Sequence, residues 1–81
     1  MNLRELKAAA RAAGIADEAY ALLGTGDERY CLTHDGPEWA VFYAERGLRN
    51  DERHHATETA ACADLLKGLL GEPSTRIANR P

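Results

Sequence analysis

The chain has few of the residues, and none of the long apolar runs, that mark membrane, secreted or metal-binding proteins. It has two cysteines in 81 residues, and no stretch approaches the roughly 18 apolar residues of a membrane span. Its N-terminal stretch carries Glu5 and lacks the uninterrupted apolar segment of a secretory signal, so we expect a cytoplasmic protein. Cys31 and Cys62 lack CxxC spacing, which favours two buried apolar side chains and leaves a disulfide open.

Motifs of catalysis and cofactor binding are also missing. No G-x-S-x-G, P-loop or G-x-G-x-x-G is present. A nucleophile pair of Cys31 with His54 or His55 would need a pocket, for which so small a chain leaves little room. His54 and His55 are adjacent and point to opposite faces of a strand, so they do not form a zinc site together. We expect no enzyme, no cofactor and no metal.

The acidic charge is concentrated in the middle of the chain. The net charge is −3, and residues 27–58 hold eight acidic side chains against four arginines. Nucleic-acid binding needs a clustered positive surface, and residues 57–62, at the start of the last predicted helix, contain no basic residue. The composition therefore disfavours a nucleic-acid partner.

Helical periodicity appears at both ends of the chain. Apolar residues at steps of three and four predict a helix over residues 3–13, with Asn2 as its cap and Gly14 at its end. A second apolar stripe predicts a helix that begins after Thr57 and stops at Gly71. Residues 72–81 show no pattern and are predicted to be a mobile tail outside a single domain of residues 1–71.

Between the helices, β-prone runs alternate with turn residues. Strands are predicted at residues 30–34, 39–44 and 48–55, with a possible short extra strand at residues 20–23. The predicted class is α+β: an N-terminal helix, a three-stranded antiparallel sheet and a C-terminal helix packed on one sheet face.

The strand at residues 39–44 presents two different faces. Trp39, Val41 and Tyr43 alternate with Ala40, Phe42 and Ala44. If the first set faces the helices, its aromatics belong to the core. If the second set does, Trp39 and Tyr43 form an exposed aromatic platform for binding. Both arrangements stay open.

The segment EWAVFYAERGLRNDERHHATETAACADLLKGLL resembles a group of small bacterial proteins associated with polymorphic toxin systems. These have a W-x-V-[FY]-Y-x-E-R-G hairpin, a polar strand and an S/T-E-x-x-A-x-x-x-L-L helix. The resemblance covers most of residues 12–70 and departs at His54 and His55, near which the family has a large apolar residue. It implies a non-catalytic, toxin-neutralising role and assigns no functional residue.

The alternating charges of the central hairpin are the predicted partner-binding surface. Six residues make up this surface: Glu38, Glu45, Arg46, Arg49, Asp51 and Glu52. An excess of carboxylates there favours a basic protein partner, such as a toxin, over a membrane or nucleic acid. The alternatives are a self-associating domain that forms a homodimer and, with less support, a nucleic-acid-binding domain.

Overall fold

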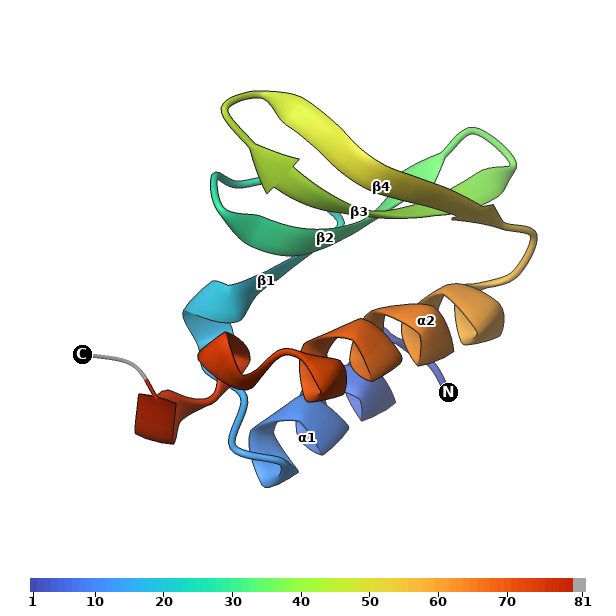
Figure 1. Ribbon diagram of the computed structural model, residues 1–81. Helices are drawn as coiled ribbons and strands as arrows, with labels where there is room; N and C mark the ends of the chain where they lie inside the picture. Colours follow the sequence, from blue (N-terminus) through green and yellow to red (C-terminus); the bar gives the residue numbers. More distant parts are fainter. Residues whose placement is uncertain (80–81) are drawn as a thin grey trace.

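The computed structural model describes residues 1–79 and places both helices on one side of a sheet (Figure 1). The main elements are, in chain order, α1 (Leu3–Ala12), β1 (Tyr20–Leu22), β2 (Arg29–Asp35), β3 (Glu38–Glu45), β4 (Leu48–His55) and α2 (Glu58–Gly71). α2 packs against β2, β3 and β4, and α1 packs against α2. The predicted α+β class is confirmed.

The sheet differs from the prediction in strand number and in strand direction. It has four strands in the order β1-β2-β3-β4, where three were predicted with a possible extra one. β1 runs parallel to β2, with Tyr20 opposite Tyr30, so the sheet is mixed. Parallel neighbours usually need a connection of about a dozen residues or more. Here residues 23–28 suffice, with Leu23 and Glu28 both at positive φ (58° and 54°).

α1 begins and ends as its sequence predicts. The Asn2 side chain accepts a hydrogen bond from the Glu5 amide at 2.8 Å, and Glu5 accepts one from the Asn2 amide at 2.9 Å. Gly14 has φ 78°, and the amide of Ile15 folds back to the carbonyl of Ala10 at 2.9 Å. These caps satisfy backbone groups at both ends and leave Ile15 in the core.

α2 begins after Thr57, whose hydroxyl accepts from the Ala60 amide at 3.1 Å. Its Glu58 accepts a hydrogen bond from the Leu3 amide at 2.8 Å, which ties the first turns of the two helices together. The sequence predicts Gly71 just beyond the end of this helix, at the C′ position; in the structure Gly71 is the last residue of α2 and Glu72 is its C-cap, which corrects that prediction. Within the described part of the chain, no helix is long and apolar enough to cross a membrane.

Trp39, Val41 and Tyr43 face the helices, which confirms the first of the two arrangements considered for β3. Val41 joins a core that both helices share with the sheet, and Trp39 packs at its margin. The opposite face carries a second, smaller cluster of buried residues: Cys31, Ala40, Phe42 and Ala44. Both faces of β3 are therefore buried, although the helices cover only one of them.

β4 contains a bulge opposite Phe42. Two residues of β4, Asp51 and Glu52, occupy the space that one residue would fill in a regular ladder. Asp51 adopts φ 55°, a left-handed conformation that aspartate tolerates better than most residues. The bulge reverses which side chains of β4 face the helices along the rest of the strand.

Residues 72–79 contact the rest of the protein, although they were assigned to a tail beyond residue 71. They form two short 3-10 turns, Pro73–Thr75 and Ile77–Asn79. The Thr75 carbonyl accepts from the amide of Ala16, and the Ile77 amide donates to the Gly14 carbonyl, both at 2.8 Å. Residues 80 and 81 lie outside the described residues. The predicted mobility of the segment in solution stays a prediction.

Arg76 connects this segment to the ends of both helices. Its guanidinium donates to the carbonyl oxygen of Ala13 at 3.3 Å and to that of Leu70 at 3.0 Å. These carbonyls lie at the C-terminal ends of α1 and α2, where the helix dipole favours a cation. Arg76 thus stabilises two helix ends with one charge.

Candidate functional site

The predicted partner-binding residues divide between two places. Arg49, Glu52 and Glu38 lie on the outer face of the sheet, away from the helices, and form the outer-face network together with Asp35 and His54. The other three predicted residues, Glu45, Arg46 and Asp51, lie at the β3–β4 turn and at the bulge.

Arg49 covers the second cluster of buried residues. Its guanidinium carbon lies 4.4 Å from the centre of the Phe42 ring, within the range of a cation–π contact. Its Nη1 donates to Asp35 at 2.7 Å and lies 3.7 Å from Glu52. The hydrogen bond from Arg49 lowers the pKa of Asp35. Arg49 therefore shields Phe42 from water and is already paired within the protein.

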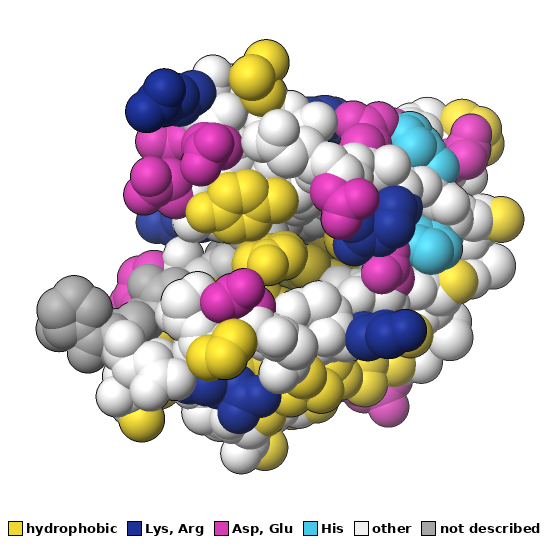
Figure 2. All heavy atoms as spheres, viewed as in Figure 1, with side chains coloured by type: hydrophobic (Ala, Val, Ile, Leu, Met, Phe, Trp, Pro, Cys, Tyr) yellow, Lys and Arg dark blue, Asp and Glu magenta, His cyan; other side chains and the backbone are white. Residues whose placement is uncertain are grey.

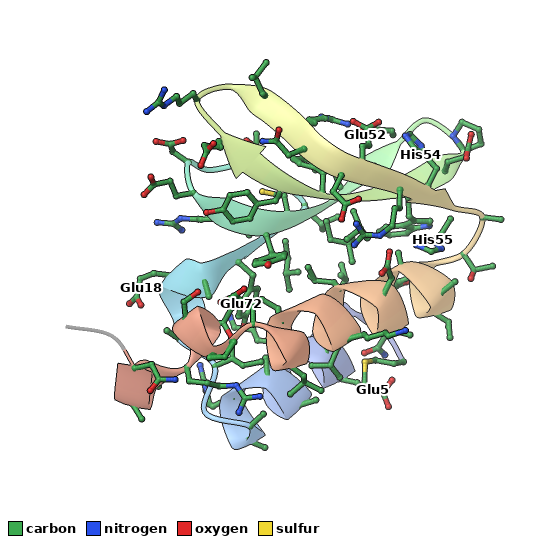
Figure 3. The ribbon with its side chains drawn as sticks, viewed as in Figure 1. Glu5, Glu18, Glu52, His54, His55 and Glu72 are labelled. Carbon is green, nitrogen blue, oxygen red and sulfur yellow. The ribbon has the colours of Figure 1, made fainter. Side chains whose placement is uncertain are left out.

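His54 and Glu52 form the exposed edge of this network (Figure 3). The His54 ring is hydrogen-bonded to the Glu52 carboxylate through Nε2, and its Nδ1 lies 3.9 Å from Glu38. The hydrogen bond to Glu52, followed by the nearby negative charges, raises the pKa of His54. Protonated His54 offsets part of the negative charge on this face.

The residues at the turn and the bulge are less fully paired. Arg46 has φ 53°, and its amide donates to the Asp27 side chain at 2.8 Å. Asp51 pairs with Arg53 at 2.8 Å, but its side chain is 85% exposed. Glu45 makes no ion pair with any residue from 1 to 79. Carboxylates thus remain available to a partner at this end of the sheet.

Two tyrosines lie on the helix side of this same end and are only partly covered. The ring centres of Tyr30 and Tyr43 are 5.1 Å apart with an interplanar angle of 69°, an edge-to-face contact. Gly68 of α2 faces Tyr30, where a Cβ atom would lie 3.8 Å from the ring. Because the helix presents no side chain at Gly68, the ring of Tyr30 stays only half-buried.

The opening forms a groove between the sheet and α2, which we call the tyrosine groove. It consists of two adjoining hollows of about 270 and 410 Å³ that share Tyr30 and Glu72. Its lining residues are Tyr30, Tyr43, Asp51, Arg53, Asp64, Lys67, Gly68, Gly71, Glu72 and Ser74. Figure 2 shows hydrophobic side chains at the base of this hollow and acidic side chains on both of its sides.

Asp64 forms one wall of the groove and joins α2 to β4. Its Oδ2 accepts from Arg53 Nε at 2.7 Å and from His55 Nε2 at 2.8 Å. Since a carboxylate only accepts, His55 carries a proton on Nε2. Burial alone would raise the pKa of Asp64, but these two hydrogen bonds outweigh it and lower the pKa. Figure 3 shows His55 between the sheet and α2, on the side opposite His54.

Carboxylates surround the tyrosine pair at the end of the sheet. Burial raises the pKa of Tyr43, and three negative side chains raise it further: Glu28, Glu45 and Asp27. Burial likewise raises the pKa of Tyr30, followed by the charge of Glu72. The tyrosine rings therefore lie in a negative electrostatic environment.

Several groove residues were not predicted as site residues from the sequence. They come from two distant segments of the sequence: Tyr30 lies in β2, whereas Asp64, Gly68 and Glu72 lie in or just after α2. No local sequence pattern connects the two segments. One signal was present: a lone glycine inside a helical pattern often has a packing or functional reason. Gly68 is such a glycine.

Within residues 1–79, neither cysteine is hydrogen-bonded to a histidine. Cys31 and Cys62 are both free and fully buried, in the outer and the helix-side clusters respectively, as the buried-residue interpretation predicted. Burial raises the pKa of both thiols, which disfavours the reactive thiolate form. Within residues 1–79, no group of three or more His, Cys, Asp or Glu side chains is arranged to hold a metal ion.

Comparisons with models of protein families, with curated proteins and with solved structures find no match for this chain. The outer-face network and the tyrosine groove are therefore the features from which a function can be proposed.

Proposed function

We propose that the chain is a non-catalytic protein-binding module that neutralises a basic partner, as an immunity or antitoxin protein does. The observation that carries this proposal is the set of carboxylates around the β3–β4 hairpin that lack arginine partners. Glu45 has no ion pair within residues 1–79, and Glu38 has only His54, at 3.9 Å. Unpaired carboxylates on a protein surface attract and orient a positively charged partner.

Two of the three arginines of the hairpin do not cancel this charge. Arg49 is held by Asp35 and covers Phe42, and Arg53 is held by Asp64 and Asp51. The third, Arg46, is exposed in the turn and forms no ion pair within residues 1–79, so Glu38 and Glu45 keep their charge without an arginine partner. Toxins that act on nucleic acids carry basic surfaces because they bind phosphates, which makes them suitable partners for such a hairpin. We place the interaction in the cytoplasm.

The direct test is binding to the product of the neighbouring gene, with both proteins purified at full length. We expect a complex whose affinity falls as the salt concentration rises. Glu45→Gln should weaken it about threefold at low salt, the size of effect of one exposed ion pair. The matched control is Glu18→Gln, because Glu18 is exposed in the short turn Asp17–Ala19, outside the hairpin. Absence of binding at both low and moderate salt would count against the proposal.

The alternative of a homodimer through the sheet edge has weaker support. β4 is an edge strand, but its bulge at Asp51 and its run of charged side chains are features that oppose edge-to-edge pairing. We expect light scattering to give the mass of a monomer. A stable dimer that contacts β4, or salt-sensitive binding to duplex DNA or RNA, would favour the other functions instead.

A further inference from the structure

The tyrosine groove has the size and shape of a side-chain binding site. The hollow at Tyr43 measures about 270 Å³, below the roughly 300–1,000 Å³ typical of sites that enclose a small molecule. Both tyrosines of the edge-to-face pair line it, and both are only partly buried. The hollow is thus suited to a single extended side chain with an apolar stem.

The charges around the groove favour a positively charged side chain. Glu72 lines both hollows, and Asp27, Glu28 and Glu45 lie close enough to raise the pKa of Tyr43. None of these four carboxylates forms an ion pair within residues 1–79, although Asp27 accepts a hydrogen bond from the Arg46 amide and Glu72 accepts one from the Ser74 amide. Of the two cations that line the groove, Arg53 is already held by Asp51 and Asp64. Lys67 lines the hollow that does not include Tyr43. The site at Tyr43 is therefore negative.

We infer that the tyrosine groove binds a lysine or arginine side chain from the basic protein partner. The apolar stem lies along Tyr30 and Tyr43, and the charged end lies near Glu72, the carboxylate that lines both hollows. A cation over an aromatic ring and close to carboxylates gains both cation–π and ionic attraction. This inference rests on the proposed function, since it names the part of the surface that the basic partner contacts.

The carboxylates around the tyrosines argue for a cation rather than an apolar side chain. An apolar side chain would bring no charge to offset the carboxylates it partly desolvates. An acidic side chain would be repelled by the same groups. Lysine and arginine both combine a long methylene stem with a terminal charge, which matches a groove with an aromatic base and an acidic rim.

The test uses the full chain, labelled with ¹⁵N, and three blocked pentapeptides with glycine on either side of one lysine, arginine or norleucine. Because one exposed cationic side chain binds weakly, titration should extend to about 20 mM peptide. We expect the lysine or arginine peptide to give saturable shifts of the amides around Tyr43, Gly68 and Glu72. The norleucine peptide, which has the stem without the charge, should give none.

Paired variants separate the groove from the rest of the surface. Tyr43→Leu should weaken binding about threefold or more, while Tyr43→Phe, which keeps the ring face, should bind like the wild type. Glu72→Gln should weaken it about threefold, whereas the control Glu18→Gln, outside both the groove and the hairpin, should not. The amide spectra of the variants show directly whether each is folded.

Three results would overturn the inference: no saturable shift with either cationic peptide, equal shifts with norleucine, or shifts on the outer face that Glu38→Gln removes. The proposed function fails separately. If the chain binds the basic neighbouring product with unchanged affinity in Glu72→Gln and Tyr43→Leu, the function stands and the groove assignment is wrong. If the cationic peptides occupy the groove but the chain binds no basic protein, the groove assignment stands and the function is wrong.

Discussion

The bridge from Asp64 to β4 should be the most costly ionic contact in the protein to break, and Asp64→Asn tests it. The Asp64 side chain is only 21% exposed and accepts hydrogen bonds from Arg53 and His55 on one oxygen. A hydrogen bond to a charged group contributes about 1.5–3 kcal/mol. Asparagine keeps one neutral acceptor, and the two donors regain some water. We therefore expect a loss of about 2 kcal/mol, or about 10 °C in Tm for a domain of this size.

The matched control is Asp51→Asn, which makes the same chemical change on the same arginine. Asp51 pairs with Arg53 at 2.8 Å, but its side chain is 85% exposed, and asparagine suits its left-handed backbone. An exposed pair of this kind contributes about 0–1 kcal/mol. Urea unfolding followed by Trp39 fluorescence at pH 7 should therefore separate the two variants clearly.

The pH dependence gives a second, independent check. Because the pKa of Asp64 is lowered in the folded protein, its stabilisation is fully present above the pKa of an unfolded aspartate, about 3.9. It is lost as the pH falls through the lower, folded-state pKa. The difference between wild type and Asp64→Asn should be constant near pH 7 and shrink below about pH 4. Equal losses for the two variants, or a difference that persists in strong acid, would refute the assignment of this bridge.

Three further predictions concern the tail, the outer face and the groove. Truncation after Gly71 should lower the stability in urea unfolding by about 3 kcal/mol, because it removes several hydrogen bonds to the helix ends. If residues 72–81 are a mobile tail, the truncation should leave the stability unchanged. Glu52→Gln should lower the pKa of His54 toward 6.5 in an NMR titration of the imidazole. An unchanged titration midpoint would contradict the hydrogen bond between His54 and Glu52. Gly68→Ala should raise the stability by about 1 kcal/mol in thermal unfolding, because alanine is the better helix former and its Cβ would lie at an ordinary contact distance from the Tyr30 ring. A loss of stability would mean that α2 has no room for a side chain at this position.

The parts of the fold that follow local rules were predictable. The N-cap and glycine stop of α1, the cap at Thr57 and the apolar stripe of α2 each depend on residues within a few positions of one another. The alternation in β3 likewise identified two faces, and the greater apolar area of Trp39, Val41 and Tyr43 favoured the one that meets the helices. Local chemistry was sufficient in each case.

The direction of β1 was not predictable by the same means. A short, turn-rich connection between two strands normally indicates a hairpin. Residues 23–28 instead return the chain to the start of β2, with two non-glycine residues at positive φ, Leu23 and Glu28. Neither residue type signals a left-handed conformation. The bulge at Asp51 has the same origin, because aspartate permits this backbone without requiring it.

The tyrosine groove shows why the alternatives for β3 were too simple. An aromatic residue on the helix side was taken to be core, and one on the outer side to be a binding site. Tyr43 and its cross-strand neighbour Tyr30 lie on the helix side and yet remain partly exposed, and α2 presents only Gly68 to the ring of Tyr30. Whether an inward-facing side chain is covered depends on the residue at one position of another element, which no periodicity within β3 can reveal.

The sequence was an even poorer guide to which charged side chains remain unpaired in the fold. The hairpin contains an obvious run of alternating charges, but in the fold Arg49 and Arg53 pair with carboxylates from β2 and α2. The carboxylates around Tyr43 come instead from the loop before β2, the β3–β4 turn and the residue after α2. A charged surface is determined by which charges remain after intramolecular pairing, and that pairing depends on contacts between distant segments. Most charges of the hairpin are therefore paired within the protein, whereas the carboxylates around Tyr43, among them the hairpin's own Glu45, come from three separate segments and form no ion pair within residues 1–79.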